Sequence, residues 1–250
     1  MPEPMPARLF AQRGRGWLCA VATLTLACTQ APPPEPASAA ARPIPWVWES
    51  HGRIPSGATQ AAILSETIHL SGDAVRSWPR GVKVQVAADV AITPVVHVEV
   101  SRVNPPAGLR AASAEITQAL QRAAGRSTSG WVQLDLEAPL RLRTQYLELV
   151  QSSRAALPAN VRLSVTALAW WCTGGGWLDS LAADEVVPMF FRMGKDGAVL
   201  RELQTNSPHK LHAKCRAGAI GTAHQEPFAA STTARFAKHY RFDYRAKPPP

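Results

Sequence analysis

Residues 130–139, with the sequence GWVQLDLEAP, constrain the fold of this chain more than any other segment. A run this apolar that ends at a proline is typical of a buried parallel strand. Yet Gln133, Asp135 and Glu137 stand at every second residue, so all three point to the same face of that strand. Burying two carboxylates is costly unless they are paired, hydrogen-bonded or close to solvent. Polar side chains that approach the carboxyl end of a parallel strand are typical of α/β barrels, which carry their functional sites there.

The rest of the chain alternates extended patterns with helical ones. We expect strands at 45–48, 62–70, 82–87, 94–100, 131–137, 161–168, 185–190 and 215–221. Apolar residues at helical spacing predict helices at 109–124 and 140–156, and a third, shorter helix near Trp177. This alternation predicts a parallel sheet of the α/β class, and the number of strands favours a TIM-like (β/α)8 barrel. Its first quarter should be irregular or incomplete because the early connections are short; the alternative is a flatter, doubly wound sheet.

The N-terminus has the pattern of an export signal. Three arginines among residues 8–15 precede an apolar stretch at 17–27, which is too short to span a bilayer. The stretch ends directly before Cys28 and resembles a bacterial lipoprotein signal. We therefore expect a signal peptide over 1–28, lipidation of Cys28, and a periplasmic or outer membrane-anchored protein. The alternatives are an ordinary cleaved signal and an intracellular protein.

The remaining chain predicts one domain between two unstructured segments. Residues 29–43 are rich in proline and alanine, which is typical of an extended linker. Residues 44–245 suffice for one barrel domain, and residues 246–250 predict a disordered tail. The net charge of +9 does not indicate nucleic-acid binding, because no expected helix carries a basic stripe and export removes that partner. We expect a monomer without a cofactor, held at the membrane through its lipid anchor.

Two cysteines remain after the signal peptide, Cys172 and Cys215. A pair of thiols in an oxidising compartment favours a disulfide. The alternative is two separately buried thiols.

Polar and aromatic side chains also share faces on other expected strands. His97 and Glu99 lie on one face of the fourth strand, which is unusual unless that face meets a polar cavity. The alternative is an interior histidine bonded to Glu99 or to a carbonyl. Trp46 and Trp48 share a face of the first strand, and Trp171 follows the sixth. Such tryptophans serve either as core residues or as stacking platforms for sugar rings.

These strand ends predict a single concave pocket. In a barrel the carboxyl ends of the strands converge on one rim, so polar residues from separate strands become one cluster. Arg192 would supply the permanent cation that clustered carboxylates need. We expect the pocket to be lined by Trp48, His97, Glu99, Asp135, Glu137, Arg192 and Glu226. The alternative is that each polar end is solvated on its own.

Six segments in matching order carry a family resemblance. They are WVWE (46–49), HVE (97–99), QLDLEA (133–138), LSVTAL (163–168), VPMFFRMG (187–194) and GTAHQEP (221–227). Together they resemble an uncharacterised bacterial family, the domain of unknown function numbered 3142, over about residues 44 to 228. The resemblance implies a secreted barrel of glycosidase-like type with no assigned reaction.

A more distant similarity is to the chitinase-like enzymes of glycoside hydrolase family 18, whose fourth strand ends in D-x-D-x-E. Glu137 and Asp135 match the last two positions, which implies a general acid and a residue that orients the substrate. Gln133 replaces the first aspartate. A later M-x-Y-D motif keeps its methionine here, but Phe191 and Arg192 replace the phenol and the acid.

The sequence therefore favours a protein that acts on glycan of the cell envelope, and it leaves open whether the protein is an enzyme. In a glycoside hydrolase-like enzyme Glu137 would donate the proton, with Asp135 beside it and with Glu99 or Glu226 as a second carboxylate. The substrate-binding residues we expect are Trp46, Trp48, His97, Glu99, Gln133, Trp171, Arg192 and Glu226.

Three alternatives remain. The first is a non-catalytic barrel that binds glycan, and the second is a structural envelope lipoprotein. The third is a metal site formed by His97, Glu99, Asp135 and Glu137, which are suitable ligand types but lack a close H-x-H spacing.

Overall fold

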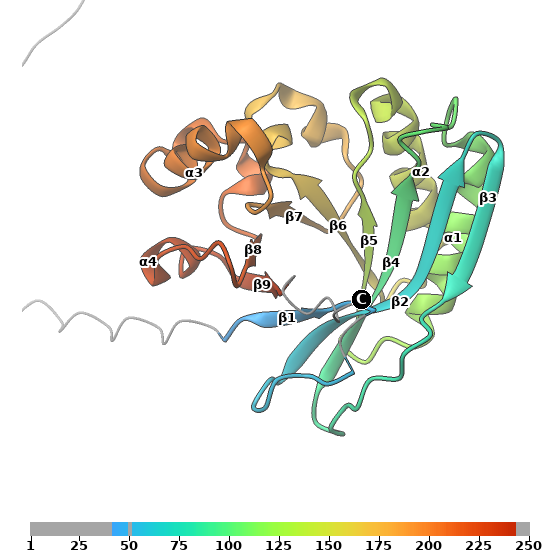
Figure 1. Ribbon diagram of the computed structural model, residues 1–250, viewed down its shortest axis with the longest axis horizontal. Helices are drawn as coiled ribbons and strands as arrows, with labels where there is room; N and C mark the ends of the chain where they lie inside the picture. Colours follow the sequence, from blue (N-terminus) through green and yellow to red (C-terminus); the bar gives the residue numbers. More distant parts are fainter. Residues whose placement is uncertain (1–41, 50–51, 244–250) are drawn as a thin grey trace, which may run out of the picture. The chain divides into compact units, whose positions relative to one another are not determined.

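A computed structural model describes residues 42–49 and 52–243, and over these residues eight parallel strands close into a barrel. Closure comes from β1, which pairs with both β2 and β9 (Figure 1). The barrel strands are β1 (Ile44–Val47), β2 (Gln60–Ser71), β4 (Ala91–Val100), β5 (Trp131–Leu136), β6 (Arg162–Leu168), β7 (Glu185–Met189), β8 (Ala219–Ala223) and β9 (Lys238–Phe242). With helices between strands, this is the predicted TIM-like (β/α)8 barrel.

Helices cover the outside of the barrel in its middle part. The helix α1 (Arg110–Ala124) connects β4 to β5, and α2 (Arg143–Ala156) connects β5 to β6 after the 3-10 turn η1 (Leu140–Leu142). Both helices lie against the strands (Figure 1), and both bury an apolar face in the core, as predicted. The predicted third helix is a 3-10 turn, η3 (Gly176–Ser180).

Two further helices lie in the last quarter, α3 (Gly197–Asn206) between β7 and β8 and the short α4 (Ala230–Thr233) between β8 and β9. In the described part of the first quarter, no helix joins β1 to β2 or β2 to β4. The predicted irregularity of this quarter is therefore confirmed.

One predicted strand was wrong and one barrel strand was missed. Residues 82–87 form a loop whose Val82 and Val86 are 44% and 41% exposed, so their alternation does not bury an apolar face. The chain instead forms β3 (Ala74–Pro79), which pairs antiparallel with β2 as a hairpin outside the barrel. The place in the barrel is taken by β9, which pairs parallel with β8 and β1.

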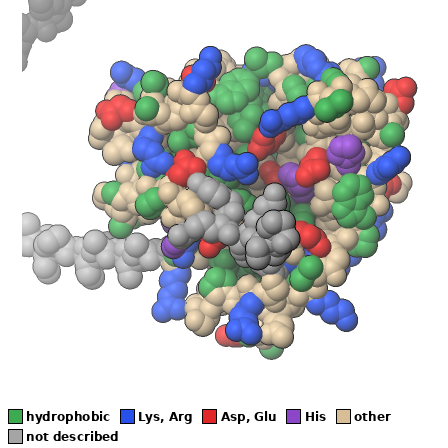
Figure 2. Space-filling view, viewed as in Figure 1, with side chains coloured by type: hydrophobic (Ala, Val, Ile, Leu, Met, Phe, Trp, Pro, Cys, Tyr) green, Lys and Arg blue, Asp and Glu red, His purple; other side chains and the backbone are tan. Residues whose placement is uncertain are grey.

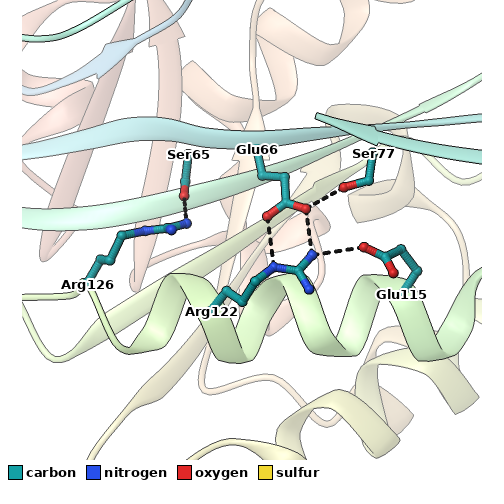
Figure 3. Close-up of polar contacts among 6 residues, drawn as sticks. All are labelled: Ser65, Glu66, Ser77, Glu115, Arg122 and Arg126. Atoms are coloured by element: carbon teal, nitrogen blue, oxygen red, sulfur yellow. Dashed lines mark hydrogen bonds and ion pairs between the residues drawn. The ribbon is translucent and has the colours of Figure 1, made fainter. Parts of the chain in front are cut away.

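A polar cluster on the outer face of the barrel ties this hairpin to α1 (Figure 3). Glu66 of β2 is only 5% exposed. Its carboxylate accepts hydrogen bonds from Arg122 of α1, at 2.6 Å and 3.3 Å, and from Ser77 of β3. Arg122 also contacts Glu115 at 2.8 Å. Although burial would raise the pKa of Glu66, the bonds from Arg122 and Ser77 lower it below its ordinary value. The charged groups of this cluster are paired with one another, and the cluster holds the hairpin against α1.

The predicted disulfide is present between Cys172 and Cys215, whose Cα atoms lie 5.9 Å apart. It joins the turn after β6 to the turn before β8. None of the described helices has the length and apolar character that a membrane span requires. The predicted signal peptide with Cys28, most of the linker at 29–43, and the tail at 246–250 lie outside the described residues.

Candidate functional site

The carboxyl ends of the barrel strands open into a pocket of about 240 Å³. It is lined by Trp46, Trp48, His97, Glu99, Asp135, Glu137, Thr166, Met189, Phe191, Arg192 and Phe242. A wider groove of about 780 Å³ continues from it and shares His97, Glu99, Glu137, Met189, Phe191 and Arg192. Of the seven residues predicted to line one pocket, six do so, and Glu226 does not. The polar strand ends are therefore one cluster.

At the floor of the pocket, Asp135 is held by two neighbouring strands. Its Oδ2 lies 2.7 Å from Nδ1 of His97 on β4, and its Oδ1 accepts a hydrogen bond of 2.6 Å from Thr166 on β6. The register explains this contact, because His97 lies directly beside Asp135 in the β4–β5 pair. Thr166 was not singled out from the sequence, although it stands two residues after Ser164 and so faces inward with it.

The environment favours the charged forms of both His97 and Asp135. Burial alone would lower the pKa of His97, but the carboxylates of Asp135 and Glu99 raise it above its ordinary value. Burial would likewise raise the pKa of Asp135, whereas the His97 cation and the bonds from His97 and Thr166 lower it. The floor of the pocket therefore favours an ion pair between His97 and Asp135. Glu99 lies at the rim of the pocket. Its Oε1 is 3.5 Å from Nε2 of His97, and 54% of its side chain is exposed.

Glu137 is the other carboxylate of the pocket, and it is held differently. It follows β5 directly, and its carboxylate makes no hydrogen bond with another residue of the described chain. Glu137 is exposed towards the pocket, but partial desolvation by the walls and the negative charge of Asp135 raise its pKa, against the weaker effects of His97, Arg102 and Arg192. Glu137 is therefore a carboxyl group that retains its proton to higher pH than an ordinary glutamate.

Gln133 lies below the pocket, where it positions an aromatic wall rather than facing the opening. It is fully buried, and its Oε1 accepts a hydrogen bond of 2.7 Å from Nε1 of Trp46. Its Nε2 donates to Ser164 at 3.1 Å, and Ser164 donates to Glu185 at 2.9 Å. Glu185 in turn pairs with Lys238 at 2.7 Å. The polar ladder predicted on β5 thus continues as a hydrogen-bonded column through the barrel interior.

Glu226 lies outside the pocket lining, where its carboxylate contacts the loop that carries Arg192. Its Oε1 accepts a hydrogen bond of 3.0 Å from the backbone N–H of Arg192, and its Oε2 lies 3.7 Å from Arg201 of α3. Arg192 has a φ of 51°, and it is the one non-glycine residue with positive φ in the described chain. A side chain in this backbone region is strained unless its surroundings hold it there. Glu226 therefore fixes the loop that presents Arg192.

Trp171 lies outside the pocket. It is 2% exposed and packs edge-on against Tyr146 and Trp177 between the barrel and its helices. The aromatic walls of the pocket are instead Trp48, which contacts His97 and Phe242 at ring distances of 5.4 Å and 5.5 Å, and Phe191. Phe242 belongs to the missed strand β9, so sequence patterns could not place it.

The described residues contain no group of three or more His, Cys, Asp or Glu side chains arranged to hold a metal ion. His97, Glu99, Asp135 and Glu137, named above as possible ligands, do not form such a group. His97 is already engaged by Asp135, at 2.7 Å from its Nδ1.

Comparison of the chain with protein-family models, with curated proteins and with solved structures finds no significant match. The geometry of the pocket is therefore the basis for assigning a function.

Proposed function

We propose that this protein acts on a glycan of the cell envelope as a glycoside hydrolase-like enzyme, with Glu137 as the proton donor. The observation that carries the proposal is the position of Glu137 in the pocket lining beside Asp135, where no described residue hydrogen-bonds its carboxyl group and its pKa is raised. A carboxyl group of this kind keeps its proton to higher pH than an ordinary glutamate, and no described neighbour engages that proton. General acids of glycosidases have the same property.

Asp135 supports this acid without competing for the same role. The His97 cation keeps Asp135 ionised, and the negative charge of Asp135 raises the pKa of Glu137. Two carboxyl groups with pKa values moved in opposite directions are typical of a site with one acid and one permanent anion. In the proposed reaction Glu137 gives its proton to the leaving-group oxygen as the glycosidic bond breaks. Asp135 stabilises the positive charge that develops on the sugar.

A second carboxylate is within reach on the neighbouring strand. In the β4–β5 register Val98 pairs with Leu136, so the next residues are Glu99 of β4 and Glu137, which directly follows β5. Cα atoms of adjacent strands lie roughly 5 Å apart, and glycosidases separate their two carboxyl groups by roughly 5–10 Å. Glu99 is thus the better candidate for the residue that activates water or attacks the sugar, because Glu226 holds Arg192 instead.

The walls of the pocket fit a sugar ring. Trp48, Phe191 and Phe242 present aromatic surfaces, and sugars bind proteins by stacking their apolar faces on such rings. The polar residues on the opposite side supply hydrogen bonds to hydroxyl groups. The export signal predicted from the sequence favours envelope glycans as the substrates available to the protein.

The experiment is a hydrolysis screen of the purified mature protein against envelope glycans, which measures the release of new reducing ends. The expected result is activity on at least one glycan that is lost in Glu137→Gln, because glutamine keeps the shape but has no acid proton. The matched control is Glu148→Gln, which removes a half-exposed carboxylate 3.6 Å from Arg110 on the outer surface. Equal activity of Glu137→Gln and the control would refute the role of Glu137.

A second candidate function is glycan binding without catalysis. The observation in its favour is the replacement, in the family 18 motif, of the phenol and acid by Phe191 and Arg192, both of which line the pocket. A binding protein would release no reducing ends from any glycan of the screen. Its Glu137→Gln variant would bind glycan as tightly as the wild type, whereas its Trp48→Ala variant would bind glycan more weakly.

A further inference from the structure

The groove that continues from the pocket carries more positive than negative side chains. Arg102, Arg141 and Arg192 line it, and Glu99 and Glu137 are the carboxylates among its described lining residues. His69 and His97 also border it. Figure 2 shows basic, acidic and histidine side chains gathered close together on the face it draws. A neutral glycan does not require such an excess of guanidinium groups.

Two of these arginines have no structural contact through their guanidinium groups with the rest of the described chain. Arg102 and Arg141 are exposed, and neither makes a hydrogen bond or an ion pair with another described residue. Two arginines elsewhere on the barrel are paired instead, Arg122 with Glu66 at 2.6 Å and Arg154 with Asp184 at 2.7 Å. The donors of Arg102 and Arg141 are therefore available to a ligand in the groove.

Arg192 links this groove to the pocket, since it lines both. Its backbone is held at a φ of 51° by the bond of its N–H group to Glu226. Strained backbone that the surroundings hold in place is found at ligand-binding positions more than elsewhere. Arg192 thus borders both the pocket with its carboxylates and the groove with Arg102 and Arg141.

We propose that the substrate is an acidic glycan, with one sugar ring in the pocket and an oxyanion on a neighbouring sugar bound in the groove by Arg102, Arg141 and Arg192. This proposal rests on the proposed function and specifies its substrate class. A guanidinium donates two parallel hydrogen bonds to a carboxylate or to a phosphate, so either group satisfies the same chemistry. The groove opens to solvent beside the pocket, which leaves room for a chain that extends beyond the bound ring.

The test is binding of four matched probes to the Glu137→Gln protein, which removes turnover. They are the neutral N-acetylglucosamine tetrasaccharide, its form with lactyl carboxylates, the methyl ester of that form, and a 6-phosphorylated tetrasaccharide. We expect the carboxylate form, the phosphate form or both to bind about tenfold more tightly than the neutral probe and the ester at moderate salt. The tighter of the two charged probes identifies the source of the oxyanion.

Removing the arginines tests the site itself. In the Arg102→Gln, Arg141→Gln double variant the ratio of charged to neutral affinity should fall about tenfold. Arg216→Gln is the matched control, because Arg216 is exposed, lies before β8 and lines neither the pocket nor the groove. A melting curve for each variant checks that it is folded.

The outcomes separate this inference from the function on which it rests. Equal binding of charged and neutral probes, with hydrolysis of the neutral one by the wild type, overturns the acidic substrate and keeps the hydrolase. Arginine-dependent binding of a charged probe that the wild type does not cleave keeps the acidic ligand and overturns the hydrolase. Binding of none of the four probes and cleavage of no screened glycan overturns both.

Discussion

Glu66 and Glu137 show how two glutamates of one barrel come to different states. Glu66 lies on the outer face of β2, almost fully buried, and Arg122 and Ser77 bind its carboxylate (Figure 3). Its pKa is lowered although burial alone would raise it. Glu137 stands at the pocket rim without a hydrogen-bonding partner among the described residues, and burial and Asp135 raise its pKa. The two carboxylates therefore differ in both respects: Glu66 is buried and paired, whereas Glu137 is exposed and has no hydrogen-bonding partner among the described residues.

The largest expected difference between the two positions is in activity. We expect Glu137→Gln to lower kcat/KM on a cleaved glycan roughly 10²- to 10⁴-fold, the usual contribution of a general acid. The free energy of unfolding should change by less than about 0.5 kcal/mol, because the side chain has no bonded partner to lose. Steady-state kinetics and thermal melting check both values. A strong loss of stability would show that Glu137 is a structural residue like Glu66.

At Glu66 the expected effect is on stability. We expect Glu66→Gln to cost about 2 kcal/mol of unfolding free energy, at the lower end for bonds to charged groups because Arg122 is partly exposed. Since the pKa of Glu66 is lowered in the folded protein, its stabilisation is present above the pKa of the unfolded carboxyl group. It is lost as pH falls through the lower folded value.

Urea unfolding as a function of pH measures this effect, with Glu148→Gln as the control for an exposed ion pair. The Glu66→Gln variant should lose less unfolding free energy on acidification than the wild type does. An unfolding free energy equal to that of the wild type would show that the Arg122 contact contributes nothing.

The smallest expected effect is a shift in pH dependence. Protonated Glu137 is the active form, so activity should fall as pH rises through its raised pKa. We expect Asp135→Asn to move this alkaline limb to lower pH, because the negative charge that raises the pKa of Glu137 is removed. The shift is partly offset. Loss of the Asp135 charge also lowers the pKa of His97, and an uncharged His97 no longer lowers the pKa of Glu137. A pH profile of kcat/KM that does not move, or that moves to higher pH, would contradict the coupling.

The sequence predicted those parts of the fold and site that depend on strand periodicity. The alternation of Gln133, Asp135 and Glu137 placed a polar column inside a barrel, and His97 beside Asp135 follows from the same period. The strand β9 was missed because Lys238 and Arg241 interrupt its apolar pattern, although Tyr240 is buried in the barrel. Residues 82–87 alternate equally well, but the hairpin of β2 and β3 leaves them outside the sheet.

Roles that depend on contacts between distant residues could not be predicted. Glu226 looked like a pocket residue because it follows a strand end, yet its carboxylate turns to the backbone of Arg192. Trp171 is a tryptophan like Trp48, but it packs edge-on against Tyr146 and Trp177 and therefore lies in the core rather than in the pocket. Periodicity gives the face of a strand, whereas the partner of a side chain after the strand end depends on loop geometry.

Glu137 should keep its proton at a pH where the partnered Glu66 has released its own. A carboxyl-carbon NMR titration of the folded protein measures this directly, with Glu137→Gln and Glu66→Gln used to assign the two resonances. We expect a pKa for Glu137 above the ordinary glutamate value and a pKa for Glu66 below it. A pKa for Glu137 at or below that of Glu66 would contradict the proton donor and the function proposed from it.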